Sequence, residues 1–185
     1  MGKLVLVTGG ARSGKSRFAE EYAARFGTDV AYIATAQVLD KEMQFRVDLH
    51  KRRRPKSWQT YEAPFRAQEA IRAASREHDM ILFDCLTLYI SNMLCRMDDF
   101  ADAAANYERL QQDLTPLIEE VKAADSTVVF VTNEVGGGIV PENHLAREYR
   151  DLVGIANQLM ARAADEVYWV VAGIAVDVKK IGVSL

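Results

Sequence analysis

"LVLVTGGARSGKS", residues 4–16, joins an apolar run to a glycine-rich loop that matches G-x-x-x-x-G-K-[ST] at every defined position. The apolar run is typical of a strand buried on both faces in a parallel sheet. Aromatic residues then recur every four positions, as Phe18, Tyr22 and Phe26, and Gly27 follows them. This spacing predicts a helix that ends at the glycine. A phosphate-binding loop needs a strand before it and a helix after it, so the stretch predicts a nucleotide site.

The residue types in this loop suit phosphate chemistry. Its glycines let the backbone curl until N–H groups point at phosphate oxygens, and the following helix adds its positive end. We expect Lys15 to reach the β- and γ-phosphates and Ser16 to ligate Mg²⁺. A second metal ligand is expected at the end of an apolar strand, and "MILFD", residues 80–84, offers Asp84. Apolar strands that end in aspartate are common, so a structural role for this acid stays open.

The rest of the chain alternates strand and helix patterns without repeats or linkers. Strands are predicted at 3–8, 29–34, 57–62, 80–84, 127–134 and 166–173, and helices from Lys15 and at 37–54, 65–77, 86–96, 103–124 and 143–164. Such alternation favours a single α/β domain over residues 1–185, with a mostly parallel sheet flanked by helices.

Composition narrows the class of protein. The chain has 185 residues, of which 49% are hydrophobic, so it can bury a core and is not a disordered sequence. Its net charge of −3 argues against a general nucleic-acid binder. Cys85 and Cys95 lack zinc-site spacing and are expected to be reduced core thiols. We see no signal peptide and no apolar segment of the roughly 18 residues that a membrane span needs, and we expect a soluble cytoplasmic protein.

A basic helix carries the first of three histidines. Arg46, His50 and Arg54 are four residues apart and share one helix face, and residues 51–53 add positive charge. Nearby positive charges favour a neutral imidazole, which is the form that attacks phosphorus. The arginines would stabilise negative charge during phosphoryl or nucleotidyl transfer. The alternative is a solvated basic helix in which His50 has no role.

Other polar residues are ambiguous by sequence. His78 is expected on the surface near a strand start, and His144, at a helix start, is either a surface residue or a substrate contact. Thr87 and Asn92 lie on an otherwise apolar helix, where they either contact a ligand or cap backbone groups.

A glycine-rich loop, "VGGGIVP", follows the strand predicted at 127–134. Ligands in parallel α/β sheets lie beyond the carboxyl ends of the strands. Gly136–Gly138 would therefore allow the backbone to approach a ligand closely or to move when the ligand binds. The alternative is a flexible turn without a role in binding. Arg147 and Arg150 follow on the next helix, where they face an anionic substrate or form surface ion pairs.

Six stretches, in order over nearly the whole chain, together resemble the bifunctional adenosylcobinamide kinase/adenosylcobinamide-phosphate guanylyltransferase family of cobalamin biosynthesis. They are "TGGARSGKS", "YIATAQ", "HKRRRPKSWQTYEAP", "DCLTLYISN", "VTNEVGGGIVPENHLAREYRDLVGIANQ" and "ADEVYWVVAGI". The resemblance implies a single-domain P-loop fold related to the recombinase core, assembled as a homotrimer. It also implies phosphorylation of adenosylcobinamide by ATP or GTP, and then transfer of GMP from GTP to adenosylcobinamide phosphate through a GMP–histidine intermediate.

The resemblance also assigns roles by position. It makes His50 the guanylylated residue, and it agrees with the expected role of Asp84. The phosphate-loop motif itself makes Lys15 a catalytic residue and Ser16 the other Mg²⁺ ligand. The resemblance implies nucleotide contacts at Gly9, Gly10, Ala11, Arg12, Ser13, Gly14, Lys15, Ser16, Ala34, Thr35, Ala36, Lys51, Arg52, Arg53, Arg54, Glu62 and Asp84.

Two other functions remain as alternatives. One is a monofunctional small-molecule P-loop kinase, which needs no histidine nucleophile. The other is a recombinase-like, ATP-driven module that binds nucleic acid, against which the net acidity and the concentration of basic residues at 46–54 argue.

Overall fold

The computed structural model describes residues 2–38, 40–96 and 102–183, apart from the side chains of residues 42, 46, 53 and 103. The strands are β1 (Lys3–Thr8), β2 (Val30–Ala34), β3 (Gln59–Glu62), β4 (Met80–Asp84), β5 (Thr127–Val131), β6 (Glu166–Val171) and β7 (Ile174–Asp177). The helices are α1 (Lys15–Phe26), α2 (Lys41–Arg53), α3 (Ala67–Ala74), α4 (Leu86–Leu94), α5 (Ala103–Ala123), α6 (His144–Ala163) and α7 (Val178–Ile181).

These strands form one sheet in the order β3-β2-β4-β5-β1-β6-β7. All neighbouring pairs are parallel except β6 and β7, which are antiparallel. The predicted α/β class with a mostly parallel sheet is therefore confirmed. β1 lies between β5 and β6 and is parallel to both. The loop that follows β1 is therefore at the carboxyl edge of the sheet, where parallel α/β folds bind ligands.

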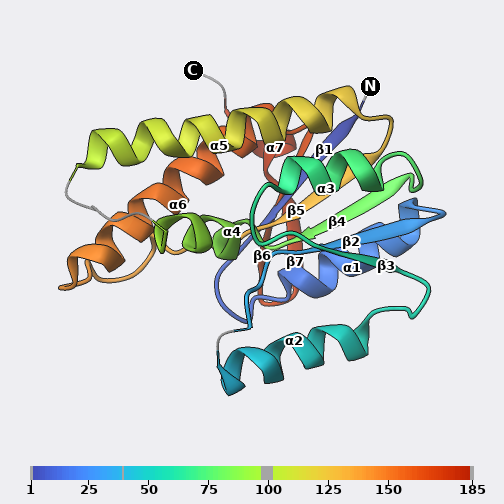
Figure 1. The fold of residues 1–185 in the computed structure, drawn as a ribbon, viewed down its shortest axis with the longest axis horizontal. Helices are drawn as coiled ribbons and strands as arrows, with labels where there is room; N and C mark the ends of the chain where they lie inside the picture. Colours follow the sequence, from blue (N-terminus) through green and yellow to red (C-terminus); the bar gives the residue numbers. More distant parts are fainter. Residues whose placement is uncertain (1, 39, 97–101, 184–185) are drawn as a thin grey trace.

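Helices cover both faces of the sheet (Figure 1). One core cluster joins α3, α4, α5 and α6 to one face, with Phe83 and Phe130 among its largest fully buried side chains. The second cluster joins α1 to the other face through Ala19, Tyr22 and Ala23. No helix among the described residues is both long enough and apolar enough to cross a bilayer.

The ends of several elements differ from the sequence prediction. The strand predicted at 127–134 ends at Val131, and the one predicted at 166–173 ends at Val171. Ala172 and Gly173 turn the chain with positive φ angles of 49° and 81°, and the chain continues into β7 and α7, which the pattern does not predict. The helix predicted at 37–54 begins only at Lys41, because the Asp40 carboxylate accepts a hydrogen bond from the Met43 N–H at 2.7 Å.

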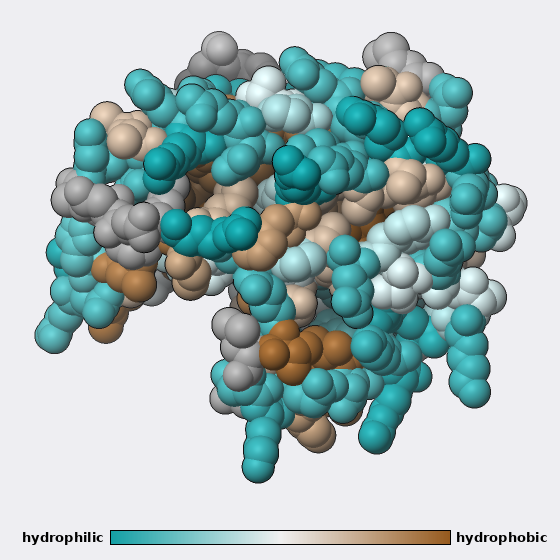
Figure 2. All heavy atoms as spheres, viewed as in Figure 1, coloured by the Kyte–Doolittle hydropathy of each residue, from teal (hydrophilic) through white to brown (hydrophobic). Residues whose placement is uncertain are grey.

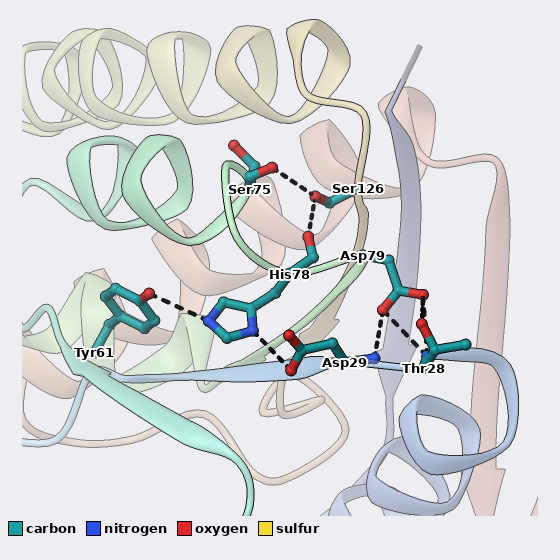
Figure 3. A network of polar contacts seen from close by, with 7 residues as sticks. All are labelled: Thr28, Asp29, Tyr61, Ser75, His78, Asp79 and Ser126. Carbon is teal, nitrogen blue, oxygen red and sulfur yellow. Dashed lines mark hydrogen bonds and ion pairs between the residues drawn. The ribbon is translucent and has the colours of Figure 1, made fainter.

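The prediction that His78 lies on the surface is wrong. Its side chain is buried between Asp29, which precedes β2, and Tyr61 on β3 (Figure 3). Nδ1 lies 3.0 Å from Oδ1 of Asp29, and Nε2 lies 3.3 Å from the Tyr61 hydroxyl. The Ser126 hydroxyl donates to the His78 carbonyl at 2.6 Å. His78 therefore ties together the segments that begin β2, β4 and β5 and the edge strand β3.

The cysteines divide between core and surface. Cys85 is buried and Cys95 is exposed, and both are free thiols. The prediction of core thiols holds for Cys85 alone.

Candidate active site

The glycine-rich loop closes against the turn between β6 and β7. Gly14 has a φ of 97°, a left-handed conformation that favours glycine. A Cβ added there would lie 3.1 Å from the Gly173 Cα, so a side chain would crowd the turn as well as strain the backbone. The Gly173 N–H donates to the Ser13 carbonyl at 2.8 Å. The last strands of the chain thus help to set the shape of a loop formed near its beginning.

Lys15 begins α1 with its ammonium held over the loop. The side chain is buried, and Nζ donates to the Gly10 carbonyl at 3.2 Å. Burial lowers the pKa of Lys15, and the neighbouring Cys85 and Asp84 act in the opposite direction. The ammonium therefore lies where the loop's backbone would surround phosphate oxygens, as the motif predicts.

Asp84 ends β4 at the same edge of the sheet and contacts two other side chains. The Tyr32 hydroxyl donates to Asp84 Oδ2 at 3.1 Å, and His50 Nδ1 lies 3.6 Å from the same oxygen. Burial, and next the Asp84 carboxylate, raise the pKa of Tyr32, which keeps the phenol protonated as a donor. The structure therefore brings Asp84 and His50, predicted separately, into one cluster, and it adds Tyr32, which the sequence did not single out.

The surroundings of His50 differ from the predicted ring of positive charge. Among the described side chains, the charged group recorded beside the imidazole is the Asp84 carboxylate. Arg54 turns away: its Nε donates to the His50 carbonyl at 3.3 Å, and its Cζ lies 3.4 Å from the centroid of the Tyr32 ring. Lys51 and Arg52 are exposed. The predicted contributions of Arg46 and Arg53 fall on side chains outside the described set.

A groove beside this cluster gathers several predicted nucleotide contacts. It encloses about 360 Å³ and is lined by Lys51, Arg54, Pro55, Lys56, Trp58, Thr60 and Glu62. A second groove of about 570 Å³ continues past Pro55 and Trp58 onto the α1 residues Arg17, Glu20, Glu21 and Ala24. In the space-filling view, α2 projects from the body, and a broad notch separates it from the end of the molecule where α6 begins (Figure 2). Lys51, Arg54 and Glu62 thus share one open site.

Thr35 does not offer its side chain to a nucleotide. The side chain is completely buried, and its hydroxyl donates to the Cys85 carbonyl and accepts from the Cys85 N–H, both at 2.8 Å. The Asn92 amide donates to the Thr35 carbonyl at 2.7 Å and to the Pro64 carbonyl at 3.1 Å. Of the two roles left open for Asn92, the structure therefore shows hydrogen bonding to the backbone.

Thr87 is also buried and bonded within the protein. Its hydroxyl accepts from the Asn133 amide at 3.1 Å and lies 3.0 Å from Cys85 Sγ. Burial, and next the Asp84 carboxylate, raise the pKa of the Cys85 thiol to about 11. Cys85 is therefore protonated at neutral pH and unsuited to nucleophilic attack, although it adjoins Asp84.

The segment after β5 returns to the phosphate loop. The Glu134 N–H donates to the Gly9 carbonyl at 3.0 Å, and Gly136–Gly138 are exposed beyond it. Arg147 donates to the carbonyls of Pro141 and Glu142, and Arg150 pairs with the adjacent Asp151 at 3.3 Å. The open glycine loop therefore lies beside the phosphate-loop motif, while these two arginines bond within their own segment.

Comparison with known proteins adds to this geometry. The profile of the family "Cobinamide kinase / cobinamide phosphate guanyltransferase" matches residues 5–178. The chain belongs to this family. Relatives named bifunctional adenosylcobalamin biosynthesis protein CobU share 42% identity in Escherichia coli K12 and 44% in Salmonella typhimurium, each over 95% of this chain and 99% of the relative. CobP of Pseudomonas aeruginosa, with the same description, is 38% identical over 94% of this chain and 96% of its own.

A solved structure of the RadB recombinase covers 90% of this chain and 73% of its own, with a TM-score of 0.48 and 14% identity. The family of this chain is identified by the sequence relationship and not by this structural likeness. The range that the family profile matches includes the phosphate loop, α2 and Asp84.

Proposed function

We propose that this chain phosphorylates adenosylcobinamide with a nucleoside triphosphate and then transfers GMP from GTP to the product through a guanylylated His50. The activity follows the family, and residues 1–185 act as one kinase and guanylyltransferase domain. The observation that carries the histidine mechanism is the position of His50, whose Nδ1 lies 3.6 Å from Asp84 at the edge of the sheet that bears the phosphate loop.

For the kinase step, the phosphate loop would hold the triphosphate of ATP or GTP. Its backbone amides and Lys15 would stabilise the charge on the γ-phosphoryl group as it passes to the cobinamide hydroxyl. A hydroxyl on Ser16 and the carboxylate of Asp84 are the hard oxygen donors that Mg²⁺ prefers. Bound there, Mg²⁺ would neutralise phosphate charge, while Tyr32 fixes one Asp84 oxygen by its hydrogen bond of 3.1 Å.

For the transferase step, a ring nitrogen of His50 would attack the α-phosphorus of GTP. The new N–P bond replaces the bond to the bridging oxygen, and pyrophosphate leaves. Nδ1 lies on the Asp84 side of the ring, and if it carries the proton, the lone pair of Nε2 is available for the attack. An oxygen of cobinamide phosphate then attacks the same phosphorus, the N–P bond breaks, and the imidazole is restored. The groove lined by Lys51, Arg54 and Glu62 adjoins the histidine and would hold the GMP moiety.

The test follows the covalent intermediate. Wild type incubated with α-labelled GTP and Mg²⁺ should retain acid-labile label after denaturation, and His50→Asn should not, while its kinase step continues and adenosylcobinamide phosphate accumulates. His144→Asn is the matched control, since His144 is an exposed histidine at the start of a helix. Label that persists on His50→Asn would identify another nucleophile. Wild type that phosphorylates cobinamide without ever carrying label would favour the monofunctional kinase.

We further propose a homotrimer that does not use nucleic acid. The apolar helix α4 offers little surface for an interface, because most of it is buried within the chain. Trp169, Val171 and Ile174 on β6 and β7 are exposed instead, and another copy would cover them favourably. Sedimentation as a monomer at micromolar concentration would contradict the trimer. ATP or GTP hydrolysis stimulated by DNA or RNA would contradict the proposal that the protein does not use nucleic acid.

A further inference from the structure

Helix α2 carries the proposed nucleophile but buries little of itself. None of its described side chains is fully buried, and Phe45 remains 63% exposed. Hydrophobic burial, the usual way in which a helix is fixed on a domain, therefore contributes little here. Some other contact must hold His50 at the sheet edge, where an error of 1 Å in a reacting atom slows a reaction by about two orders of magnitude.

Among the described side chains, His50 in the last turn of the helix and Arg54 just after it reach the sheet. His50 Nδ1 lies 3.6 Å from Asp84, a distance too long for a hydrogen bond. Arg54 stacks its guanidinium on the Tyr32 ring, with Cζ 3.4 Å from the centroid, and its Nε donates to the His50 carbonyl at 3.3 Å. The guanidinium thus connects the backbone of the proposed nucleophile to a ring that is itself fixed in the sheet.

Tyr32 is a rigid partner for this contact. It is 5% exposed on β2, between the edge strand β3 and β4, and its hydroxyl donates to Asp84. A guanidinium over an aromatic face gains most when the pair is shielded from water, as this buried ring partly ensures. The same phenol therefore contacts the two elements that must meet: its face holds the helix of His50, and its hydroxyl holds the carboxylate that His50 approaches.

We infer that Tyr32 is a positioning residue for guanylylation, which places His50 through the stacked Arg54 while its hydroxyl orients Asp84. The inference rests on the proposed function of His50. It assigns two separable effects to one side chain, because phenylalanine keeps the aromatic face and removes the hydroxyl, whereas leucine removes both.

The experiment compares Tyr32→Phe with Tyr32→Leu, so that the hydroxyl is absent from both and only the ring differs. Rates of His50 adduct formation from α-labelled GTP, and of cobinamide phosphorylation, are measured for each. Tyr32→Leu should form the adduct about 30-fold more slowly than Tyr32→Phe, the equivalent of about 2 kcal/mol for a desolvated stacked pair. The two should phosphorylate cobinamide within about twofold of each other, because both lose the same hydrogen bond to Asp84 and, among the described residues, the group that stacks on the ring is Arg54.

A second pair guards against misfolding. Arg54→Lys keeps the charge but loses the planar group, so it should itself slow adduct formation, and Tyr32→Leu should add little further loss in that background. Equal adduct rates for the Phe and Leu variants, or full additivity with Arg54→Lys, would overturn the inference. If Tyr32→Leu does not fold, Tyr32→Met takes its place in the comparison with Tyr32→Phe, because methionine also lacks the aromatic face. An adduct rate equal to that of Tyr32→Phe overturns the inference, and a slower rate at similar kinase turnover supports it. Wild type without any His50 adduct would overturn the proposed function, and this inference with it.

Discussion

Replacing Thr35 by valine should destabilise the protein through two backbone groups rather than through the side chain itself. Valine matches threonine in shape, so the packing around this fully buried position is preserved. The hydroxyl, however, is hydrogen-bonded at 2.8 Å to both the N–H and the carbonyl of Cys85. A buried polar group left without its partner costs about 1–3 kcal/mol, so the loss of both bonds should cost about 3 kcal/mol or more. For a chain of this length, the midpoint of thermal unfolding should fall by about 6–12 °C.

Thermal and urea unfolding of Thr35→Val and Thr35→Ser measure this effect directly. Serine keeps the hydroxyl and loses one methyl group, so it should cost only about 1 kcal/mol. Two variants of equal stability, or a valine variant within about 2 °C of wild type, would show that water or a shifted backbone satisfies Cys85. Because Cys85 follows Asp84, Thr35→Val should also weaken activity more than Thr35→Ser does at temperatures where both are folded.

Three further predictions concern charge. Lys15→Ala should slow phosphorylation of cobinamide by about 100-fold or more, and turnover near that of wild type would remove the loop from the kinase step. Asp84→Asn should raise the Mg²⁺ concentration needed for both steps, and superimposable Mg²⁺ titrations would make the acid structural. Burial alone would raise the pKa of Glu166, but its hydrogen bonds, first the one from Lys3, outweigh burial and lower the pKa. The ionised Glu166 therefore stabilises the fold above the usual glutamate pKa, and this stabilisation is lost as the pH falls through the pKa of the folded state. Glu166→Gln should thus be less stable than wild type at pH 7, and its melting temperature should decline less steeply between about pH 5 and 3. Parallel curves of melting temperature against pH for wild type and variant would contradict this role of Glu166.

Features that depend on residue types at fixed spacing within one short stretch could be predicted from the sequence. The phosphate loop needs glycines, a lysine and a hydroxyl at fixed spacing, and these survive in any tertiary context. Asp84 and the strand before it were predictable for the same reason, since an apolar run and a terminal acid are adjacent in the chain. Element bounds were less certain because caps decide them, as Asp40 does for α2.

Features that depend on distant partners were not predictable. His78 lies in a charged stretch that reads as surface, and only the fold brings Asp29 and Tyr61 to its ring. Tyr32 reads as one more apolar strand residue until Arg54 stacks on it. The strand β7 is four residues long and follows a tight turn, so its pattern is too short to be distinguished from a loop.

The strand order also determines when, during synthesis, the nucleotide loop can acquire its shape. In the described sheet β1 pairs with β5 and β6, so residues 2–126 include the loop but neither neighbour of its strand. The halves of the sheet are joined once residues 127–131 have emerged, and the loop gains its support from Gly173 only after β6 has followed. Before residues 127–131 emerge, β1 has two unpaired edges, which are surfaces prone to non-native pairing. A nascent chain arrested before residue 127 should accordingly bind no nucleotide, although its phosphate-loop sequence is complete.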